Sequence, residues 1–121
     1  MKHLKKVRKF KRTKDQRQAL IKTMLGSLIM REKITVTESK AKELKSLIDP
    51  IINRSKKIKT ASQKVGAIRH LSRLLPRVAV IKLSGNFVNR FAKKNSGFCR
   101  IVRIASRKSD AARMAIIEFV E

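Results

Sequence analysis

The stretch ITVTESKAKELKSLIDPII, residues 34–52, carries two hydrophobic patterns in direct succession. Residues 34–37 form a short β-branched run, which is typical of a strand. Thr37 stands where it can cap a following helix, and Glu38 lies near the positive end of that helix. Apolar residues then recur at helical spacing, at Ala41, Leu44, Leu47, Ile48, Ile51 and Ile52. The stretch predicts a strand followed by an amphipathic helix, which Pro50 should kink or interrupt with a new turn.

A helix is also predicted upstream of this stretch. Thr13 can cap it, and Gln16 three residues later completes a capping box. Arg17 and Lys22 flank a single apolar stripe. That stripe consists of Leu20, Ile21, Met24, Leu25, Leu28 and Ile29.

Two more helices are predicted downstream. Residues 61–75 carry a helical row that Pro76 ends, made of Val65, Ile68, Leu71, Leu74 and Leu75. Residues 78–83 favour a strand by propensity, but Val80, Leu83, Phe87 and Phe91 form a helical row. We therefore favour one helix from Val78 to Ala92, although Gly85 within it would cost about 1 kcal/mol.

The C-terminal part predicts a β-hairpin. Residues 98–104 and 114–120 have strand character, and residues 107–110 supply a turn. With residues 34–37 as a third strand, a small sheet can be covered on one face by the helices. We expect an α+β fold with a three-stranded mixed sheet. A single globular domain, residues 13–121, would follow a basic extended N-terminal segment, residues 1–12.

The charge balance indicates a polyanionic partner. The 121 residues contain 32 Lys and Arg against eight Asp and Glu, a formal net charge of +24. Sixteen of these cations lie between residues 50 and 109, where there is no acid. Such a surface would repel itself without a polyanion. A solvated tail is the ordinary interpretation of the charge run in residues 1–12, but we favour a segment that orders against phosphates.

The hairpin offers a second basic cluster. Arg100, Arg103, Arg107 and Lys108 gather around its turn, and the first arm contains no acid to balance them. A solvated surface is the alternative interpretation of this cluster.

Several function classes are disfavoured. The two histidines and the single Cys99 have no metal-ligand spacing, and the four glycines form no phosphate-binding motif. Cys99 is expected in the core, and no carboxylate pair is placed for acid–base catalysis. The longest uncharged run has eight residues, too short to span a membrane. We expect no enzyme, cofactor, metal, membrane or small-molecule substrate. The chain contains no Trp or Tyr, so it has few aromatic side chains on which the bases of a single strand could stack.

The order of residues resembles the L17 family of bacterial large-subunit ribosomal proteins along nearly the whole chain. The residues that carry the resemblance are Met1-Lys2-His3, Arg12, Arg17, Ala19-Leu20, Met24, Ser27-Leu28, Glu32, Ile34, Thr37, Lys40-Ala41-Lys42-Glu43, Arg90-Phe91, Gly97-Phe98, Arg100-Ile101, Arg107, Asp110, Met114-Ala115, Ile117-Glu118 and Val120. Residues 54–86 match only in apolar pattern. The resemblance implies a two-layer fold in the order α-β-α-α-α-β-β.

The resemblance also implies a structural, non-catalytic constituent of the large ribosomal subunit in the cytoplasm. Its partners would be large-subunit ribosomal RNA and neighbouring large-subunit ribosomal proteins. A basic architectural DNA-binding protein is the alternative, although no helix-turn-helix or dimerising heptad is visible. The candidate RNA-binding residues are Lys2, His3, Lys5, Lys6, Arg8, Lys9, Lys11, Arg12, Arg17, Arg90, Arg100, Arg103, Arg107 and Lys108.

Overall fold

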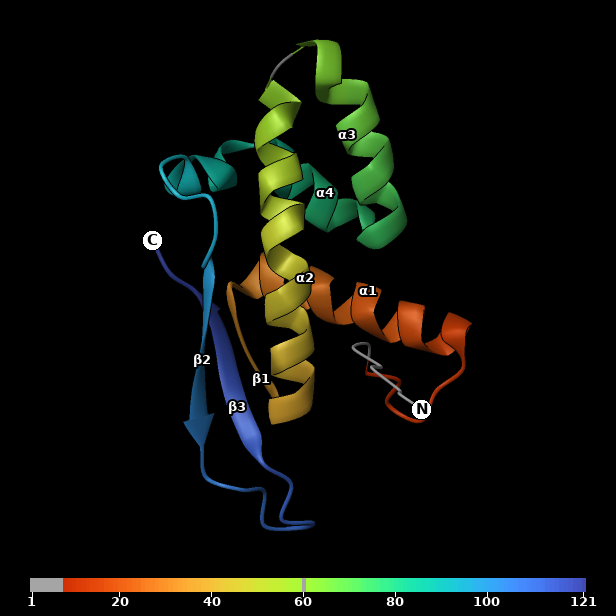
Figure 1. Ribbon diagram of the computed structural model, residues 1–121, viewed down its shortest axis with the longest axis vertical. Coiled ribbons are helices and arrows are strands. Elements are labelled where there is room, and N and C mark those ends of the chain that lie inside the picture. Colours follow the sequence, from red (N-terminus) through yellow and green to blue (C-terminus); the bar gives the residue numbers. More distant parts are fainter. Residues whose placement is uncertain (1–7, 60) are drawn as a thin grey trace, which may run out of the picture.

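A computed structural model describes residues 8–59 and 61–121 (Figure 1). Helices pack on one face of a small sheet, and the order α-β-α-α-α-β-β is confirmed apart from two short 3₁₀ segments. Within the described ranges the elements are α1 (Lys14–Arg31), β1 (Lys33–Thr37), α2 (Glu38–Lys56), η1 (Lys57–Lys59), α3 (Ala61–Leu74), α4 (Arg77–Ser84), η2 (Asn86–Phe91), β2 (Cys99–Ile104) and β3 (Met114–Phe119).

The sheet has the strand order β1-β3-β2, with β3 in the centre. Ile34 pairs with Ile117 on one side of the centre, and Ile101 pairs with the same residue on the other. Both pairings are antiparallel, so the expectation of a mixed sheet was wrong. The β-branched run at residues 34–37 predicts a strand but not its direction beside β3. That direction depends on the path that the chain takes through the helices between the two strands. The predicted hairpin of β2 and β3 is confirmed.

The start of α1 follows the sequence closely, whereas the start of α2 does not. Thr13 and Gln16 form both bonds of the capping box, at 3.4 Å each. Thr37 occupies the N-cap of α2, but its side chain makes no capping hydrogen bond. The backbone N–H of Glu38 instead donates to the Arg113 carbonyl at 2.9 Å. This bond continues the pairing of β1 with β3 by one residue into the first turn of α2. A side-chain cap from Thr37 would instead have accepted from Ser39 or Lys40.

Helix α2 runs without interruption through Pro50. Proline removes one hydrogen-bond donor from a helix and leaves the carbonyl four residues earlier, at Ser46, without its usual partner. Pro50 and Ser46 both lie on the exposed side of α2, where water can solvate that carbonyl. The proline is tolerated at this position because the opposite side of the helix is the buried one.

The segment predicted as one helix from Val78 to Ala92 is divided in two. Helix α4 ends at Ser84, and the chain continues after Gly85 as the 3₁₀ segment η2. The apolar row that suggested one helix is nevertheless buried, because α4 contributes Val80 and Leu83 and η2 contributes Phe87 and Phe91. The break at Gly85 reorients the two phenylalanines without exposing them.

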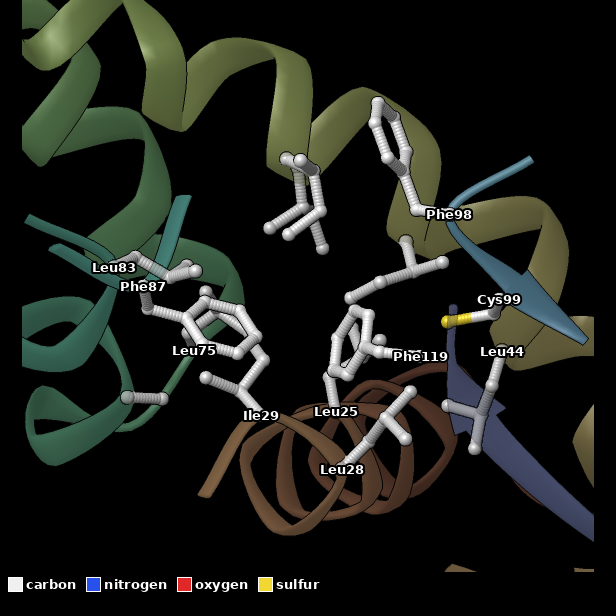
Figure 2. Packing of buried hydrophobic residues seen from close by; sticks show 14 of the residues in the cluster. Leu25, Leu28, Ile29, Leu44, Leu75, Leu83, Phe87, Phe98, Cys99 and Phe119 are labelled. Carbon is white, nitrogen blue, oxygen red and sulfur yellow. The ribbon is translucent and has the colours of Figure 1, made fainter. Parts of the chain in front are cut away.

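A continuous hydrophobic core joins the helices to the sheet (Figure 2). The apolar stripe of α1 contributes Leu25, Leu28 and Ile29, and alternate residues of β3 face α2. Four of the five phenylalanines pack within this core as a cluster, with ring centroids 5.2–5.5 Å apart, namely Phe87, Phe91, Phe98 and Phe119. Two residues of the predicted α3 stripe are exceptions: Val65 and Leu74 are 59% and 39% exposed.

The contact between α1 and α4 depends on a glycine. A Cβ atom added at Gly26 would lie 2.6 Å from Cγ and 2.8 Å from Cδ of Pro76. The proline ring cannot turn away, so Gly26→Ala should force the two helices apart. We expect the free energy of unfolding to fall by about 1–3 kcal/mol, measured by urea denaturation.

Gly66 in α3 provides the matched control. A Cβ atom at Gly66 would meet no heavy atom within 4 Å. Gly66→Ala should therefore raise the free energy of unfolding by up to about 1 kcal/mol, since alanine favours a helix. Equal effects of the two substitutions would contradict the close packing at Gly26.

Candidate nucleic-acid interface

The cations of the hairpin are balanced by acids from other elements. Arg100 Nε donates to Glu118 Oε1 on the neighbouring strand β3 at 2.6 Å. Arg103 Nη2 lies 3.3 Å from Glu38 Oε1 at the start of α2. The first arm itself contains no acid, and its arginines are paired with carboxylates of β3 and α2. The partners are distant in sequence and meet only when β2 pairs with β3 and packs near α2.

Arg107 is paired within the turn. Its Nε and Nη2 donate to the two carboxylate oxygens of Asp110 at 3.0 and 2.7 Å. The same carboxylate accepts from the backbone N–H of Ala112 at 3.1 Å. Lys108 makes no ion pair within the described part of the chain and is exposed. The turn is thus internally braced, with Lys108 projecting beside it.

These ion pairs leave the arginines accessible. The side chains of Arg100, Arg103 and Arg107 are 64%, 76% and 48% exposed. A guanidinium carries five N–H donors, and each of these pairs uses only one or two of them. The pKa of Glu118 is lowered by the hydrogen bond from Arg100, and that of Glu38 is lowered by the hydrogen bond from Lys42. The remaining donors can still reach a phosphate.

Arg90 is held more completely within the protein than the hairpin cations. It forms ion pairs with Glu32, which follows α1, and with Glu121 at 2.7 Å. Its guanidinium also lies over the rings of Phe87 and Phe91, 5.3 and 5.6 Å from their centroids. The hydrogen bond from Arg90 lowers the pKa of Glu32. Arg90 therefore connects the end of α1 to η2 and the C-terminal segment.

The N-terminal candidates divide into two groups. Lys2, His3, Lys5 and Lys6 lie outside the described residues. Arg8 forms an ion pair with Glu43 of α2 at 3.0 Å, which ties the end of the extension to the globular part. Arg17 is half-buried on α1. Three further candidates lie between these two arginines and are exposed, namely Lys9, Lys11 and Arg12.

Sequence reasoning missed the cations on the helical side of the molecule. Exposed basic side chains follow one another along α3 and into α4, and within the described residues they make no ion pair. The signal was visible as the acid-free run from residue 50 to 109, but no single motif marked it. These residues are Lys64, Arg69, Arg73 and Arg77, with Arg54 on α2.

The described residues offer no conventional catalytic centre. Burial raises the pKa of the Cys99 thiol to about 12, which keeps it protonated and inert. Across residues 8–59 and 61–121, no three His, Cys, Asp or Glu side chains are grouped to hold a metal ion. Nor is any described helix long and apolar enough to cross a membrane. Four of the phenylalanines are buried in the core, so their rings cannot form a surface on which bases stack.

Comparison with known proteins identifies the family. Residues 20–120 match the family model described as "Ribosomal protein L17". The chain belongs to this family. It is 40% identical over 122 residues to "Large ribosomal subunit protein bL17" of Hydrogenobaculum sp. (strain Y04AAS1), with both chains covered completely. The protein of the same name from Pelobacter propionicus is 37% identical, covering the whole chain and 92% of that relative.

Membership confirms the resemblance first suggested by the N-terminal and C-terminal residues. The family consists of structural, non-enzymatic proteins of the ribosome, and this chain is one of them. The matched region contains every described helix and strand except the first turns of α1. The comparisons give no support to the alternative of an architectural DNA-binding protein.

The brace in the hairpin turn predicts a distinctive titration. The hydrogen bonds from Arg107 and from the Ala112 N–H lower the pKa of Asp110 from 3.8 to about 2. A carboxyl with a lowered pKa stabilises the fold when ionised, so the turn should loosen only as the pH falls from about 4 towards 2. Arg107→Gln should raise the pKa of Asp110, measured from its carboxyl ¹³C shift. Glu118 should be unaffected, and an Asp110 titration near 4 in the unaltered protein would exclude the brace.

The contacts of Arg90 predict a stabilising role that the hairpin arginines do not share. Arg90→Gln removes two ion pairs and two cation–π contacts, so the free energy of unfolding should fall by about 1 kcal/mol. Arg100→Gln, at a 64% exposed side chain, should change it by less than about 0.5 kcal/mol. Urea denaturation of both variants measures the difference. A larger effect at Arg100 would contradict this assignment.

Proposed function

We propose that this chain, a structural constituent of the large ribosomal subunit, acts by binding large-subunit ribosomal RNA through phosphate neutralisation and shape. It would work in the cytoplasm, beside neighbouring large-subunit proteins. The relatives from Hydrogenobaculum and Pelobacter carry the name of a large ribosomal subunit protein, which supports this setting. The observation that carries the mechanism is the distribution of charge over the described surface.

Most carboxylates of the molecule are already neutralised within the protein. Among the described residues, six of the eight acids form ion pairs, namely Glu32, Glu38, Glu43, Asp110, Glu118 and Glu121. Of the other two, Asp49 accepts hydrogen bonds from the backbone N–H groups of Gly97 and Phe98. Asp15 lies in the first turn of α1. Among the described residues, Lys9, Lys11 and Arg12 before α1, and the exposed cations Lys64, Arg69, Arg73 and Arg77 of α3 and α4, form no ion pair.

Phosphate contacts position a protein on RNA without reading its sequence. In the proposed mechanism, residues 13–121 dock by shape as a single domain, and residues 1–12 pass between RNA segments and screen their mutual repulsion. The candidate residues are those predicted from the sequence. Lys9, Lys11 and Arg12 are favoured by their exposure, and Lys108 by its lack of an ion-pair partner within the described residues. Arg100, Arg103 and Arg107 would offer their remaining donors.

Sedimentation tests the setting of this function. A lysate expressing the tagged chain is separated on a sucrose gradient, and the chain should move with large subunits and 70S ribosomes at low salt. High salt should release it, because counterions compete for the phosphates. A chain that stays at the top of the gradient at every salt concentration would exclude the proposal.

Salt dependence tests the mechanism. Lys9, Lys11, Arg12 and Lys108 are replaced together by Gln, and affinity for a folded large-subunit RNA fragment is measured against salt concentration. Each lost phosphate contact should flatten the log–log slope by about 0.7 to 0.9, so the four changes should flatten it by up to about 3.6.

The control set consists of cations from the charge-balanced segment, with Lys33, Lys40, Lys42 and Lys45 changed to Gln. Lys33 and Lys42 already neutralise Glu118 and Glu38, at 3.7 and 3.2 Å. This set should flatten the slope by clearly less. Equal flattening by both sets would mean that total charge, and not its placement, governs binding.

A further inference from the structure

Residues of α1, α2 and α3 line a groove. In Figure 1, α1 lies below the C-terminal end of α3, and both helices lie beside α2. Its volume is about 710 Å³, within the range of small-ligand sites. The surface of the groove is largely aliphatic and comes from all three helices. The larger aliphatic side chains of the lining are Ile21 and Leu25 of α1, Leu47 and Ile51 of α2, and Leu74 of α3.

Cations surround this aliphatic floor. Arg17 and Lys22 come from α1, Arg54 from α2 and Arg73 from α3. Within the described residues these four form no ion pair. Two carboxylates also line the groove, but Glu43 is neutralised by Arg8 at 3.0 Å, and Asp15 lies in the first turn of α1. The groove therefore combines an apolar floor with a positively charged rim.

This combination fits a ligand with a flat apolar body and negative charge on both sides of it. An unstacked nucleotide in an RNA loop has this chemistry, since its base has two apolar faces and its flanking phosphates are anionic. A regular duplex presents phosphates but keeps its base faces stacked and cannot use the floor. Arginine guanidinium planes can also stack on a base.

We propose that the groove binds one unstacked nucleotide of the RNA, with its base on the aliphatic floor and its flanking phosphates at Arg17, Arg54 and Arg73. This inference rests on the proposed function and adds to it a position and a feature of the RNA. Because the floor is aliphatic, the site recognises the presence of an extruded base more than its identity.

The test uses the full chain and a pair of RNA hairpins that differ at one position. One hairpin carries a single-nucleotide bulge of 2-aminopurine, and the other has an abasic nucleotide at the same place. The abasic hairpin should bind about fivefold more weakly, which is the lower end of the effect of stacking a base on an aromatic side chain, because the floor here is aliphatic. The fluorescence of 2-aminopurine should change on binding.

Two variants locate the effect. Leu74→Gln makes the floor polar at a side chain that is already 39% exposed, so the fold should tolerate it. It should reduce the difference between the hairpins and leave the affinity for the abasic hairpin unchanged. Arg54→Gln with Arg73→Gln should weaken binding of the bulged hairpin more than the matched pair Arg31→Gln with Arg113→Gln, whose arginines are exposed outside the groove.

The outcomes separate this inference from the function on which it rests. Equal affinity for the two hairpins, with a steep salt dependence retained, would exclude the nucleotide site and leave RNA binding intact. A base effect that Leu74→Gln does not alter would place the base elsewhere and also exclude the site. Absence of salt-dependent binding to either hairpin would exclude both.

Discussion

The packing of α2 against both the sheet and the other helices is the interaction on which the rest of the structure depends. One side of α2 buries Leu44, Ile48 and Ile52 without measurable exposure. A chain with +24 formal charges gains no net electrostatic stability from compaction, so burial of apolar surface must supply the main driving force. Because α2 contacts the sheet, α1, α3 and α4, a single apolar stripe organises a domain whose surface repels itself.

The scarcity of carboxylates is the second constraint. Glu32, Glu38 and Glu118 each lie between two cations, so that one acid stabilises contacts among several elements. Asp49 instead holds the loop before β2 by accepting two backbone N–H groups. Negative charge is thus used where strands and helix ends meet. The helical side of the molecule is stabilised mainly by apolar packing, to which the ion pairs of Glu43 with Arg8 and of Glu32 with Lys82 are added. In the proposed function, its remaining cations would face a polyanion.

This division between paired and unpaired cations explains how a non-catalytic protein of this kind can be stably folded and still carry a strongly basic surface. Charges are paired at the edges of the sheet and at the junction of η2 with α1, where the ion pairs hold separate elements together. The side with unpaired cations also contains the groove, in which an apolar floor and a basic rim occur together. In the proposed function, the same three helices would therefore contribute to both phosphate binding and shape recognition.

The sequence by itself determined the element order, the apolar stripes, the hairpin and the basic character, because these depend on neighbours within a few residues. The capping box of Thr13 and Gln16 is such a local feature. Only the tertiary structure decided the antiparallel pairing of β1, the break after α4, and the start of α2, where the Arg113 carbonyl accepts from Glu38 and Thr37 makes no side-chain cap. The same holds for the candidate interface. The extension could be recognised from its charge run, whereas the ion pairs of Arg90, Arg100 and Arg103 join residues that are 18 to 65 positions apart. Which cations remain available depends on which carboxylates the fold brings beside them, and no local pattern contains that information.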